Sequence, residues 1–447
     1  MSLRFGTDGV RGVANVDLTP QLTLALGRAA ARALGSGRPF VVGRDTRRSG
    51  PMLEAALVAG LTAEGADVVL AGVLPTPAVA YLAQGRDGPG AVISASHNPY
   101  FDNGIKFFAR GGRKLTDDVE ARVEAELDGL LAALHRAGPV GAGVGAVHHA
   151  GDPVADYSAH LQAALEGRRL DGLPVVLDCG HGAASPVAFA VFDRLGAKVE
   201  VRNATPDGTN INDGCGATSP AGLQAEVVAA GAQVGLAFDG DADRLIAVDE
   251  KGALVDGDHL LAIAALDLRE RGRLPRDAVV ATVMANLGFR RAMAEHGIRV
   301  VETQVGDRYV LEAMEAEGIV LGGEQSGHLI FSDLATTGDG LLSGLVLLDV
   351  MSRTGRPLSE LAAVVAKLPQ VLRNVAVVRR EGLEEAGAFW AEVRAVEAEL
   401  GDGGRVLVRP SGTEPVVRIM VEAGTAEAAR AGTVRLESAL IAALGAG

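Results

Sequence analysis

The sequence predicts an α/β protein of four domains, in which three similar α/β units with mixed sheets are followed by a smaller α+β domain, arranged around a central cleft. Short apolar runs alternate with Ala- and Leu-rich segments of helical period as far as Pro369, and the pattern then changes. The length of 447 residues suits this interpretation, because domains of ~100–200 residues can each bury a core.

The three α/β units are expected at residues 1–150, 151–255 and 256–367. Each contains apolar runs of the kind found in buried strands of parallel sheets. The recurrence of one pattern at similar spacing predicts three related units, although their side chains differ. The expected strands are 40–42, 68–70 and 91–93, then 175–177, 198–201 and 234–238, and finally 278–281, 298–301 and 319–321.

Two hydroxyl residues before prolines mark expected helix starts. Thr76 precedes Pro77, and Ser219 precedes Pro220. A Ser or Thr side chain often caps free N–H groups at a helix start, and proline suits the first helical position. We therefore expect both hydroxyl groups to cap helices.

The last domain is expected at residues 368–447. Its pattern predicts strands at 374–378, 405–408 and 416–421, a helix around Trp390 and a terminal helix. This is a smaller α+β arrangement than that of the preceding units, and a hinge is expected near Leu368.

Charge and cysteine content narrow the class of protein. With 42 Lys and Arg against 56 Asp and Glu, the net charge is −14, which argues against nucleic acid or an anionic membrane as a partner. The two cysteines are too few for a disulfide framework. Without a leader-like start or a long apolar run, we expect a cytoplasmic protein, and composition does not decide between a monomer and a homodimer.

Three carboxylates follow the apolar strand that ends at Phe238. Asp239, Asp241 and Asp243 stand at alternate positions in the sequence DGDADR. Hard divalent cations take several oxygen ligands, so a turn at this place predicts a metal site, with Mg²⁺ preferred if phosphate is the partner. An EF-hand is excluded because Arg244 stands where its loop needs glycine.

The sequence SASHNP follows the buried strand that ends at Ile93. A serine at such a junction, here Ser96, can act as a nucleophile or phosphate carrier when a metal or a neighbouring base assists it. The same residues fit a plain turn in which Ser96 and Asn98 bond the backbone before Pro99. Spacing alone leaves these two interpretations even.

Two further loops carry polar groups suited to a ligand. The sequence RPSGTEP, with Arg418 beyond it, combines hydroxyls, glycine and arginines, as oxyanion sites do. A plain turn is the alternative. The sequence GGEQSGH offers a carboxylate, an amide and a hydroxyl that can bind sugar hydroxyls, which is a weaker signal.

Taken in order, the segments FGTDGVRG, ISASHNPYFDNGIKFF, FDGDADR, GGEQSGH and RPSGTEPVVR resemble the α-D-phosphohexomutase family over the whole chain. The resemblance implies a phosphoserine at Ser96 and a Mg²⁺ held by its phosphate with Asp239, Asp241 and Asp243. Ser94 lies two residues too early to carry the transferred group.

The resemblance also assigns roles to other residues. Lys106 and Arg11 match positions implicated in proton transfer and charge stabilisation, and Lys106 is expected to be a general base beside a neighbouring positive charge. His97 and Arg244 flank the same centre. The residues that match sugar and phosphate sites are Glu324 and Ser326 for the hydroxyls, with His328 beside them, and Arg409, Ser411, Gly412, Thr413 and Arg418 for the phosphate that is not transferred.

The activity that the resemblance implies is an isomerase reaction on a phosphosugar. Within the family, FGTDGVRG, VGDRYV and GEQSGH favour glucosamine 6-phosphate and glucosamine 1-phosphate, with glucosamine 1,6-bisphosphate or glucose 1,6-bisphosphate as intermediate or activator. The product would supply UDP-N-acetylglucosamine and cell-wall synthesis. Mannose or glucose phosphates are the alternative substrates, and a serine phosphatase or a non-catalytic sugar-phosphate sensor are the alternatives of other classes.

One residue departs from the family pattern. The metal loop often reads DGDGDR, and here Ala242 stands in place of the second glycine. Glycine adopts positive φ at little cost, so alanine implies either a conventional backbone at this position or a small strain.

Overall fold

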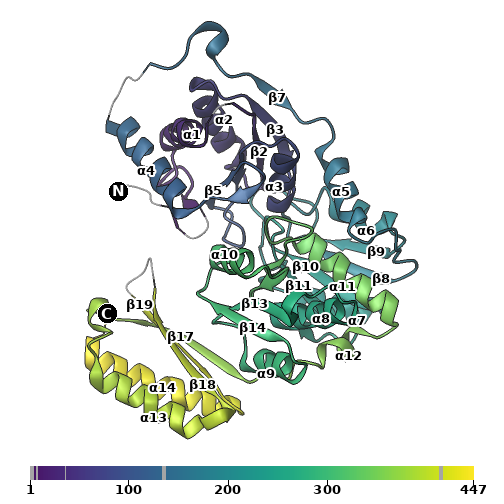
Figure 1. Ribbon diagram of the computed structural model, residues 1–447, viewed down its shortest axis with the longest axis vertical. Helices are drawn as coiled ribbons and strands as arrows, with labels where there is room; N and C mark the ends of the chain where they lie inside the picture. Colours follow the sequence, from purple (N-terminus) through teal and green to yellow (C-terminus); the bar gives the residue numbers. More distant parts are fainter. Residues whose placement is uncertain (1–4, 7–8, 36, 133–136, 412–415, 447) are drawn as a thin grey trace. The chain divides into compact units, whose positions relative to one another are not determined.

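The structure is a computed structural model that describes residues 5–6, 9–35, 37–132, 137–411 and 416–446. The chain divides into two compact units, one of residues 1–284 and 298–364 and the other of residues 285–297 and 365–447. Among the described residues, the first unit contains three mixed sheets and the second contains one antiparallel sheet (Figure 1).

The first sheet has the order β1-β5-β4-β2-β3-β7, with β6 paired to β5. Its strands β2, β3, β4 and β7 are parallel, whereas β5 runs antiparallel to both β4 and β1. The strands are β1 (Val10–Val13), β2 (Phe40–Arg44), β3 (Val68–Val73), β4 (Gly90–Ile93), β5 (Asp102–Ala109), β6 (Arg113–Lys114) and β7 (Val147–His149).

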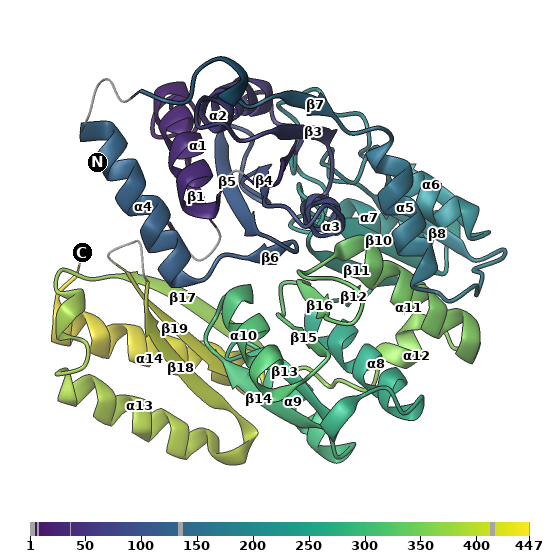
Figure 2. The same cartoon turned by 45° about the horizontal axis from the view of Figure 1, so that its top comes forward.

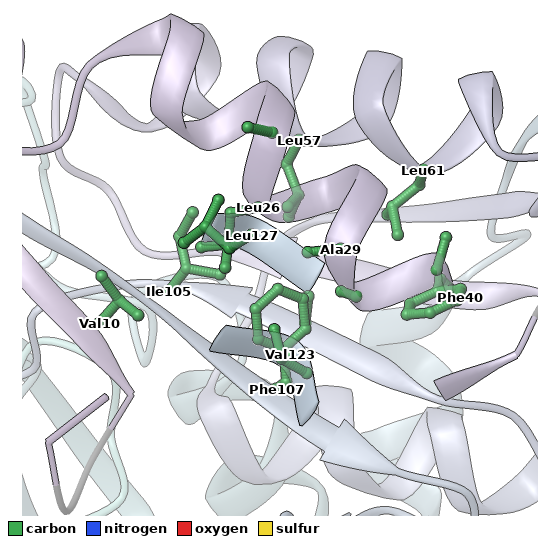
Figure 3. Close-up of a cluster of buried hydrophobic side chains, with 14 of the residues drawn as sticks. Val10, Leu26, Ala29, Phe40, Leu57, Leu61, Ile105, Phe107, Val123 and Leu127 are labelled. Atoms are coloured by element: carbon green, nitrogen blue, oxygen red, sulfur yellow. The ribbon is translucent and has the colours of Figure 1, made fainter. Parts of the chain in front are cut away.

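Helices cover both faces of this sheet. The helices α1 (Pro20–Leu34), α2 (Gly50–Ala63) and α4 (Asp117–Ala132) pack on one face, and α3 (Thr76–Gly85) packs against β2 and β4. Phe40 and Phe107 point into the core on the α1 face, together with Leu57 and Val123 (Figure 3). The burial of large apolar side chains, at ~25 cal/mol per Å², is the main stabilising term here.

The helices α1 and α2 approach closely because both carry a glycine at their contact. A Cβ atom on Gly27 would lie 2.5 Å from the Leu57 carbonyl oxygen, and one on Gly60 would lie 2.1 Å from that of Leu24. Side chains at these positions would force the two helices apart, so the contact depends on glycine.

The second sheet has the order β12-β11-β10-β8-β9, with β10, β8 and β9 parallel and β11 antiparallel to β10. Its strands are β8 (Pro174–Asp178), β9 (Lys198–Arg202), β10 (Val234–Phe238), β11 (Leu245–Asp249) and β12 (Leu254–Val255), and its helices are α5 (Pro153–Ala163), α6 (Ala188–Arg194) and α7 (Ala221–Ala230).

The third sheet has the order β14-β13-β15-β16, in which β16 is antiparallel to β15. Its strands are β13 (Ala278–Thr282), β14 (Arg299–Thr303), β15 (Leu321–Gly323) and β16 (Leu329–Phe331). The helices of this region are α8 (Gly257–Glu270), α10 (Asp307–Glu317), α11 (Gly340–Thr354) and α12 (Leu358–Ala362).

The second unit consists of the C-terminal domain and the helix α9 (Leu287–Glu295). Its antiparallel sheet β17-β19-β18 is covered by α13 and α14, whose apolar residues form one core with the sheet (Figure 2). These elements are β17 (Gln370–Ala376), α13 (Gly387–Leu400), β18 (Arg405–Pro410), β19 (Val416–Glu422) and α14 (Ala426–Leu444). Among the described residues, none of the helices combines the length and apolar composition that crossing a bilayer requires.

One arrangement recurs in all three mixed sheets and positions the polar loops. In each, a parallel strand is joined by a loop to a neighbouring antiparallel strand: β4 to β5, β10 to β11, and β15 to β16. The loops that contain Ser96, Asp239 and Glu324 are these three connections. The predicted fold class, three α/β units with mixed sheets and a smaller C-terminal domain, is confirmed.

The helix starts are correct, but the expected caps are wrong. The helix α3 begins at Thr76 and α7 at Ala221, and neither has a side-chain cap. The Thr76 hydroxyl instead donates to Asp241, a long-range contact that outweighs the local capping preference.

Candidate active site

Ser96 lies in the loop that joins β4 to β5, in a left-handed backbone conformation with φ of 51°. Its side chain is buried, and its Oγ atom donates a hydrogen bond of 2.6 Å to Oδ2 of Asp239. The Nδ1 atom of His97 lies 3.2 Å from the same Oγ atom. A hydroxyl held between a carboxylate and an imidazole is thus presented by a strained loop, as in many reactive sites.

The three carboxylates that the sequence predicts as metal ligands converge in the loop after β10. Asp239, Asp241 and Asp243 are buried and each offers an oxygen, with these oxygens all within 4.8 Å of one another. Oδ1 of Asp241 and Oδ1 of Asp243 are buried and have no hydrogen-bond partner among the described residues. Two unsatisfied carboxylate oxygens in a buried acidic trio fit a divalent cation, which takes oxygen ligands.

The electrostatics of the trio also fit a cation. Burial raises the pKa of Asp239 well above its ordinary value, and the charges of Asp243 and Asp241 raise it further. Although burial opposes the ionisation of Asp243, the cations around it, with Lys106 first among them, hold its pKa well below the usual range. The charges of the three buried acids repel one another, and a bound cation would relieve this repulsion.

Lys106 and Thr76 both bind Asp241. Nζ of Lys106 donates to Oδ2 of Asp241 at 2.9 Å and lies 3.4 Å from Oδ2 of Asp243. The Thr76 hydroxyl donates to the same Asp241 oxygen at 2.6 Å. Lys106 therefore lies against two carboxylates of the acidic trio.

The three other polar residues predicted at this centre lie beside it. Nη1 of Arg11 is 3.4 Å from the carbonyl oxygen of Ala95, and the backbone N–H of Arg244 donates to Oδ1 of Asp239 at 3.1 Å. Burial, together with the charges of Arg244 and Arg11, lowers the pKa of His97 to about 4. An imidazole that is neutral near pH 7 can accept a proton from a neighbouring hydroxyl.

The loop after β15 brings Glu324, Ser326 and His328 together. Oε1 of Glu324 accepts the backbone N–H of Gly306 at 3.1 Å, and the Ser326 hydroxyl is 3.4 Å from Oε2 of Glu324. His328 is buried, with Nδ1 3.6 Å from Oδ2 of Asp243. The loops of the second and third sheets therefore meet at this imidazole.

His328 has a second carboxylate neighbour that the sequence analysis missed. Its Nε2 atom lies 3.5 Å from Oδ2 of Asp307, which is itself paired with Lys114. Burial opposes the protonation of His328, but hydrogen bonding to Asp243 and the charges of both acids outweigh it and raise the pKa of His328. The segment VGDRYV, which contains Asp307, was noted only for its resemblance to the family, and it gave no sign of this contact because His328 comes from another loop.

The second unit contains the predicted phosphate loop. Arg409 on β18 stands directly opposite Arg418 on β19 in the strand register. Like charges opposite each other destabilise a sheet unless an anion compensates, so this pair favours an anion site. Ser411 is buried and its N–H donates to the carbonyl oxygen of Val416 at 2.9 Å, whereas Gly412 and Thr413 lie outside the described residues.

Sequence reasoning also missed Asp45, Arg47 and Asn212. Arg47 and Asn212 donate to the carbonyl oxygen of Ser96, and Asp45 pairs with Arg47. Asp45 and Arg47 follow the apolar strand β2 directly, and this position after a buried strand was the available signal. Asn212 lies in a loop without such a signal.

Comparison with protein-family models gives four matches in chain order. They are described as phosphoglucomutase/phosphomannomutase alpha/beta/alpha domain I at residues 2–132, domain II at 155–252, domain III at 256–368, and the C-terminal domain at 372–437. Together they extend over most of the chain.

Curated relatives match over nearly the whole length. A phosphoglucosamine mutase of Salinispora tropica is 57% identical over 437 residues, which is 96% of this chain and 96% of the relative. One of Streptomyces avermitilis is 55% identical over 459 residues, 100% of each chain. A solved structure of a phosphoglucomutase/phosphomannomutase family protein from Burkholderia thailandensis is similar with a TM-score of 0.82 and 28% identity, over 99% of this chain and 98% of that one.

Proposed function

The chain belongs to the phosphoglucomutase/phosphomannomutase family, and from this membership we propose that it interconverts glucosamine 6-phosphate and glucosamine 1-phosphate. Both curated relatives described above are named phosphoglucosamine mutases, and each is more than half identical to this chain. The proposed reaction runs through glucosamine 1,6-bisphosphate, and glucose 1,6-bisphosphate would serve as an activator. Its product would supply UDP-N-acetylglucosamine for cell-wall synthesis.

The observation that carries the proposal is the contact between Ser96 and the acidic trio. A serine hydroxyl 2.6 Å from a carboxylate of a buried cation site is placed where a phosphoryl group on the serine would meet the cation. We propose that Ser96 is a phosphoserine in the active protein and that Asp239, Asp241 and Asp243 hold Mg²⁺. When bound, this ion would neutralise charge on the phosphoryl group that is transferred.

In the first step, the free hydroxyl of the substrate attacks the phosphorus on Ser96, and the bond between the Ser96 oxygen and phosphorus breaks. The side-chain nitrogen of Lys106 lies beside Asp241 and Asp243, close to the oxygen of Ser96 that carries the phosphoryl group. We propose that the neutral amine of Lys106 accepts the proton of the attacking hydroxyl, and that the resulting ammonium group returns a proton to the departing sugar oxygen in the second step. Arg11, His97 and Arg244 would stabilise the negative charge left on the Ser96 oxygen. The second step reverses these changes at the other end of the sugar.

Two further loops are proposed to bind the rest of the substrate. Glu324 and Ser326 offer a carboxylate and a hydroxyl for sugar hydroxyls, with His328 beside them. In the second unit, Arg409 and Arg418 are proposed to bind the phosphate that stays in place, together with Ser411, Gly412 and Thr413. Separate sites for two phosphates suit a mutase better than a hydrolase.

The deciding experiment compares wild-type protein with Ser96→Ala and with Ser352→Ala, which removes an exposed hydroxyl on α11. Each is assayed with Mg²⁺ on glucosamine, glucose and mannose 6-phosphates, with inorganic phosphate measured in parallel. We expect wild type and Ser352→Ala to prefer the glucosamine substrate and to release almost no phosphate. Ser96→Ala should be inactive.

Three results would contradict the proposal. Steady release of phosphate would indicate a phosphatase, and faster turnover of mannose or glucose phosphate would indicate a different mutase. Full activity of Ser96→Ala would exclude Ser96 as the phosphoryl carrier. Mass spectrometry of the purified protein tests the phosphoserine directly.

A further inference from the structure

We infer that Arg47 is a positioning residue, which together with Asp45 and Asn212 holds the backbone of Ser96 in the geometry that phosphoryl transfer needs. This inference rests on the proposed function, because it concerns the loop that carries the phosphoryl group. Arg47 is not offered as a residue that touches the substrate, and its role would be exerted through the loop.

The guanidinium group of Arg47 binds the loop after β4 through four carbonyl oxygens. Nη2 donates to the oxygens of Ser96 and Asn98 at 2.8 Å each, and Nη1 donates to those of Pro99 and Asp102, the latter at 3.0 Å. The planar fork of arginine presents five N–H donors in fixed directions. One rigid group therefore sets the path of the whole loop from its reacting serine to the start of β5.

Asp45 fixes both Arg47 and the other backbone group of Ser96. Its Oδ2 atom accepts Nε of Arg47 at 2.8 Å and the Ser94 hydroxyl at 2.6 Å. Oγ of Ser94 in turn accepts the N–H of Ser96 at 2.9 Å. The N–H and the C=O of Ser96 are thus both tied to one buried ion pair, which explains how a non-glycine residue is held at φ of 51°.

Asn212 joins this network from the region of the second sheet. Its Nδ2 atom donates to the Ser96 oxygen at 3.0 Å, so that oxygen accepts bonds from two directions. The turn that contains Arg47 also contacts the second region, since Thr46 donates to the carbonyl oxygen of His181 at 2.6 Å and the N–H of Arg48 to that of Gly208 at 2.8 Å. The network therefore lies where the loop of Ser96 meets the region that carries the acidic trio.

Position matters here because Ser96 and the acids come from different sheets. Ser96 follows β4, whereas Asp239 follows β10, so neither strand alone fixes the contact between them. A displacement of about 1 Å in a reacting group can lower a rate by about 100-fold. Desolvating a buried ion pair is costly, and apolar side chains could stabilise a core equally well. The presence of the Asp45–Arg47 pair at this loop is therefore better explained by the positioning of Ser96 than by stability.

The test compares Arg47→Lys with Arg28→Lys in the full-length protein. Both replacements keep the charge and remove the fork, and Arg28 on α1 pairs with Glu64 at the end of α2, in the layer of helices that covers the first sheet. We expect Arg47→Lys to lower kcat by about 10- to 100-fold with KM for glucosamine 6-phosphate changed less than threefold. Arg28→Lys should keep kcat within twofold of wild type, even if its melting temperature falls as far as that of Arg47→Lys.

Asn212→Ala supplies a second, milder variant that leaves the buried pair intact. It should lower kcat about three- to tenfold, and the rate at which a sugar 1,6-bisphosphate phosphorylates Ser96 should fall in parallel. If Arg47→Lys does not fold, Asn212→Ala and Ser94→Ala decide the question by the same two rates. Unchanged kcat and phosphorylation rates in the folded variants, or losses that match that of Arg28→Lys, would overturn the inference.

This outcome is distinct from a failure of the proposed function. If wild-type protein shows no mutase turnover and no phosphate on Ser96, the proposed function fails. If wild type is active and depends on Ser96 while the loop variants behave as the control does, only the positioning role of Arg47 fails.

Discussion

The hydroxyl of Thr76 and the ammonium group of Lys106 donate to one and the same oxygen of Asp241, at 2.6 and 2.9 Å. That oxygen is Oδ2, whereas the buried Oδ1 of Asp241 has no hydrogen-bond partner among the described residues. The two donors therefore orient the carboxylate and leave one oxygen for a cation. Groups that hydrogen-bond to a metal-binding carboxylate, without contacting the ion themselves, commonly influence the affinity of the site for its metal.

We predict that Thr76→Val weakens Mg²⁺ binding by about 10-fold, because outer partners of metal ligands typically contribute this much. The change removes the hydrogen bond to Asp241 and keeps the shape of the side chain. Calorimetric titration of the protein with Mg²⁺ alone measures the effect without any assay of activity.

Thr76→Ser is the matched control, since it keeps the hydroxyl and removes only a methyl group. Its affinity for Mg²⁺ should stay within about twofold of wild type. Equal affinities in Thr76→Val and Thr76→Ser would show that this hydrogen bond does not orient the ligand.

The second prediction concerns Ala242, a buried residue in the left-handed backbone region, with φ of 56°. Of the two expectations for this position, the conventional backbone is wrong and the strained one is correct. The left-handed conformation costs alanine roughly 1–2 kcal/mol. Ala242→Gly removes that strain but increases the freedom of the unfolded chain, which costs about 0.4–1 kcal/mol.

We therefore expect Ala242→Gly to raise the free energy of unfolding slightly or leave it unchanged, as measured by thermal unfolding. Ala247→Gly is the control, because Ala247 is equally buried but lies in β11 with ordinary strand geometry. That control should be destabilised by about 1 kcal/mol, since glycine weakens a strand interior. A loss of the same size in both variants would mean that Ala242 carries no strain.

Residue patterns predicted the parts of the site that depend on local order along the chain. Strand-to-loop junctions predicted the loops of Ser96 and of the acidic trio, since an apolar run followed by polar residues is visible within about ten positions. Thr76 shows why other parts were missed. Its local pattern indicated a helix cap, whereas its partner Asp241 is 165 positions away.

The contacts of Arg47 were hidden for a related reason. Its partners at Ser96, Asn98 and Asp102 are backbone carbonyl oxygens 49 to 55 positions away. Every residue has such an oxygen, so the side chains of the loop give no sign that an arginine binds it. Only the folded sheet order, which places β2 beside β4, brings them together.

A ring of ion pairs in the first unit gives the third prediction. Three acids each bridge two arginines, so that the pairs close into a ring. Asp349 lies between Arg168 and Arg353, and Asp267 lies between Arg353 and Arg271. Glu166 closes the ring between Arg271 and Arg168, and it also pairs with Arg273. Hydrogen bonds from Arg168 and Arg273 lower the pKa of Glu166 to about 2. The ring joins the segment that follows α5, the C-terminal end of α8 with the residues after it, and α11.

We predict that Glu166→Gln lowers the melting temperature by about 1–2 °C near pH 7, since a half-exposed pair in a network contributes about 1 kcal/mol or less after solvent screening. A carboxyl with a lowered folded pKa stabilises the fold above its unfolded value. The difference from wild type should therefore be full above about pH 4.5, shrink as the pH falls from there toward about 2, and shrink in 1 M salt as well.

Glu317→Gln is the control for the ring, because Glu317 forms a partly exposed pair with Arg299 outside the ring. It should change the melting temperature by less than about 1 °C at every pH. A shift as large as that of Glu166→Gln would show that membership of the ring adds nothing to a surface pair.

The last prediction concerns Tyr157 on α5 and Asp339 at the start of α11. The tyrosine hydroxyl donates to Oδ2 of Asp339 at 2.7 Å, and Oδ1 of Asp339 accepts the N–H of Leu342 at 2.9 Å. Burial raises the pKa of Asp339 to about 6, although both hydrogen bonds oppose the rise. Tyr157→Phe leaves one oxygen of a buried carboxylate without this donor, which should cost about 1–3 kcal/mol at pH 8.

The pH dependence of that loss distinguishes a lost hydrogen bond from lost packing. Above about pH 6 the buried group is charged, and its unpaired oxygen carries the full desolvation cost. As the pH falls below about 6 toward the unfolded value near 3.8, the folded state takes up the proton first, so the cost shrinks and the two proteins should converge in melting temperature. Tyr100→Phe, which removes a hydroxyl from a half-exposed ring, should match wild type throughout. A loss in Tyr157→Phe that is the same at pH 5 and pH 8 would mean that the ring, and not its hydroxyl, stabilises the contact between α5 and α11.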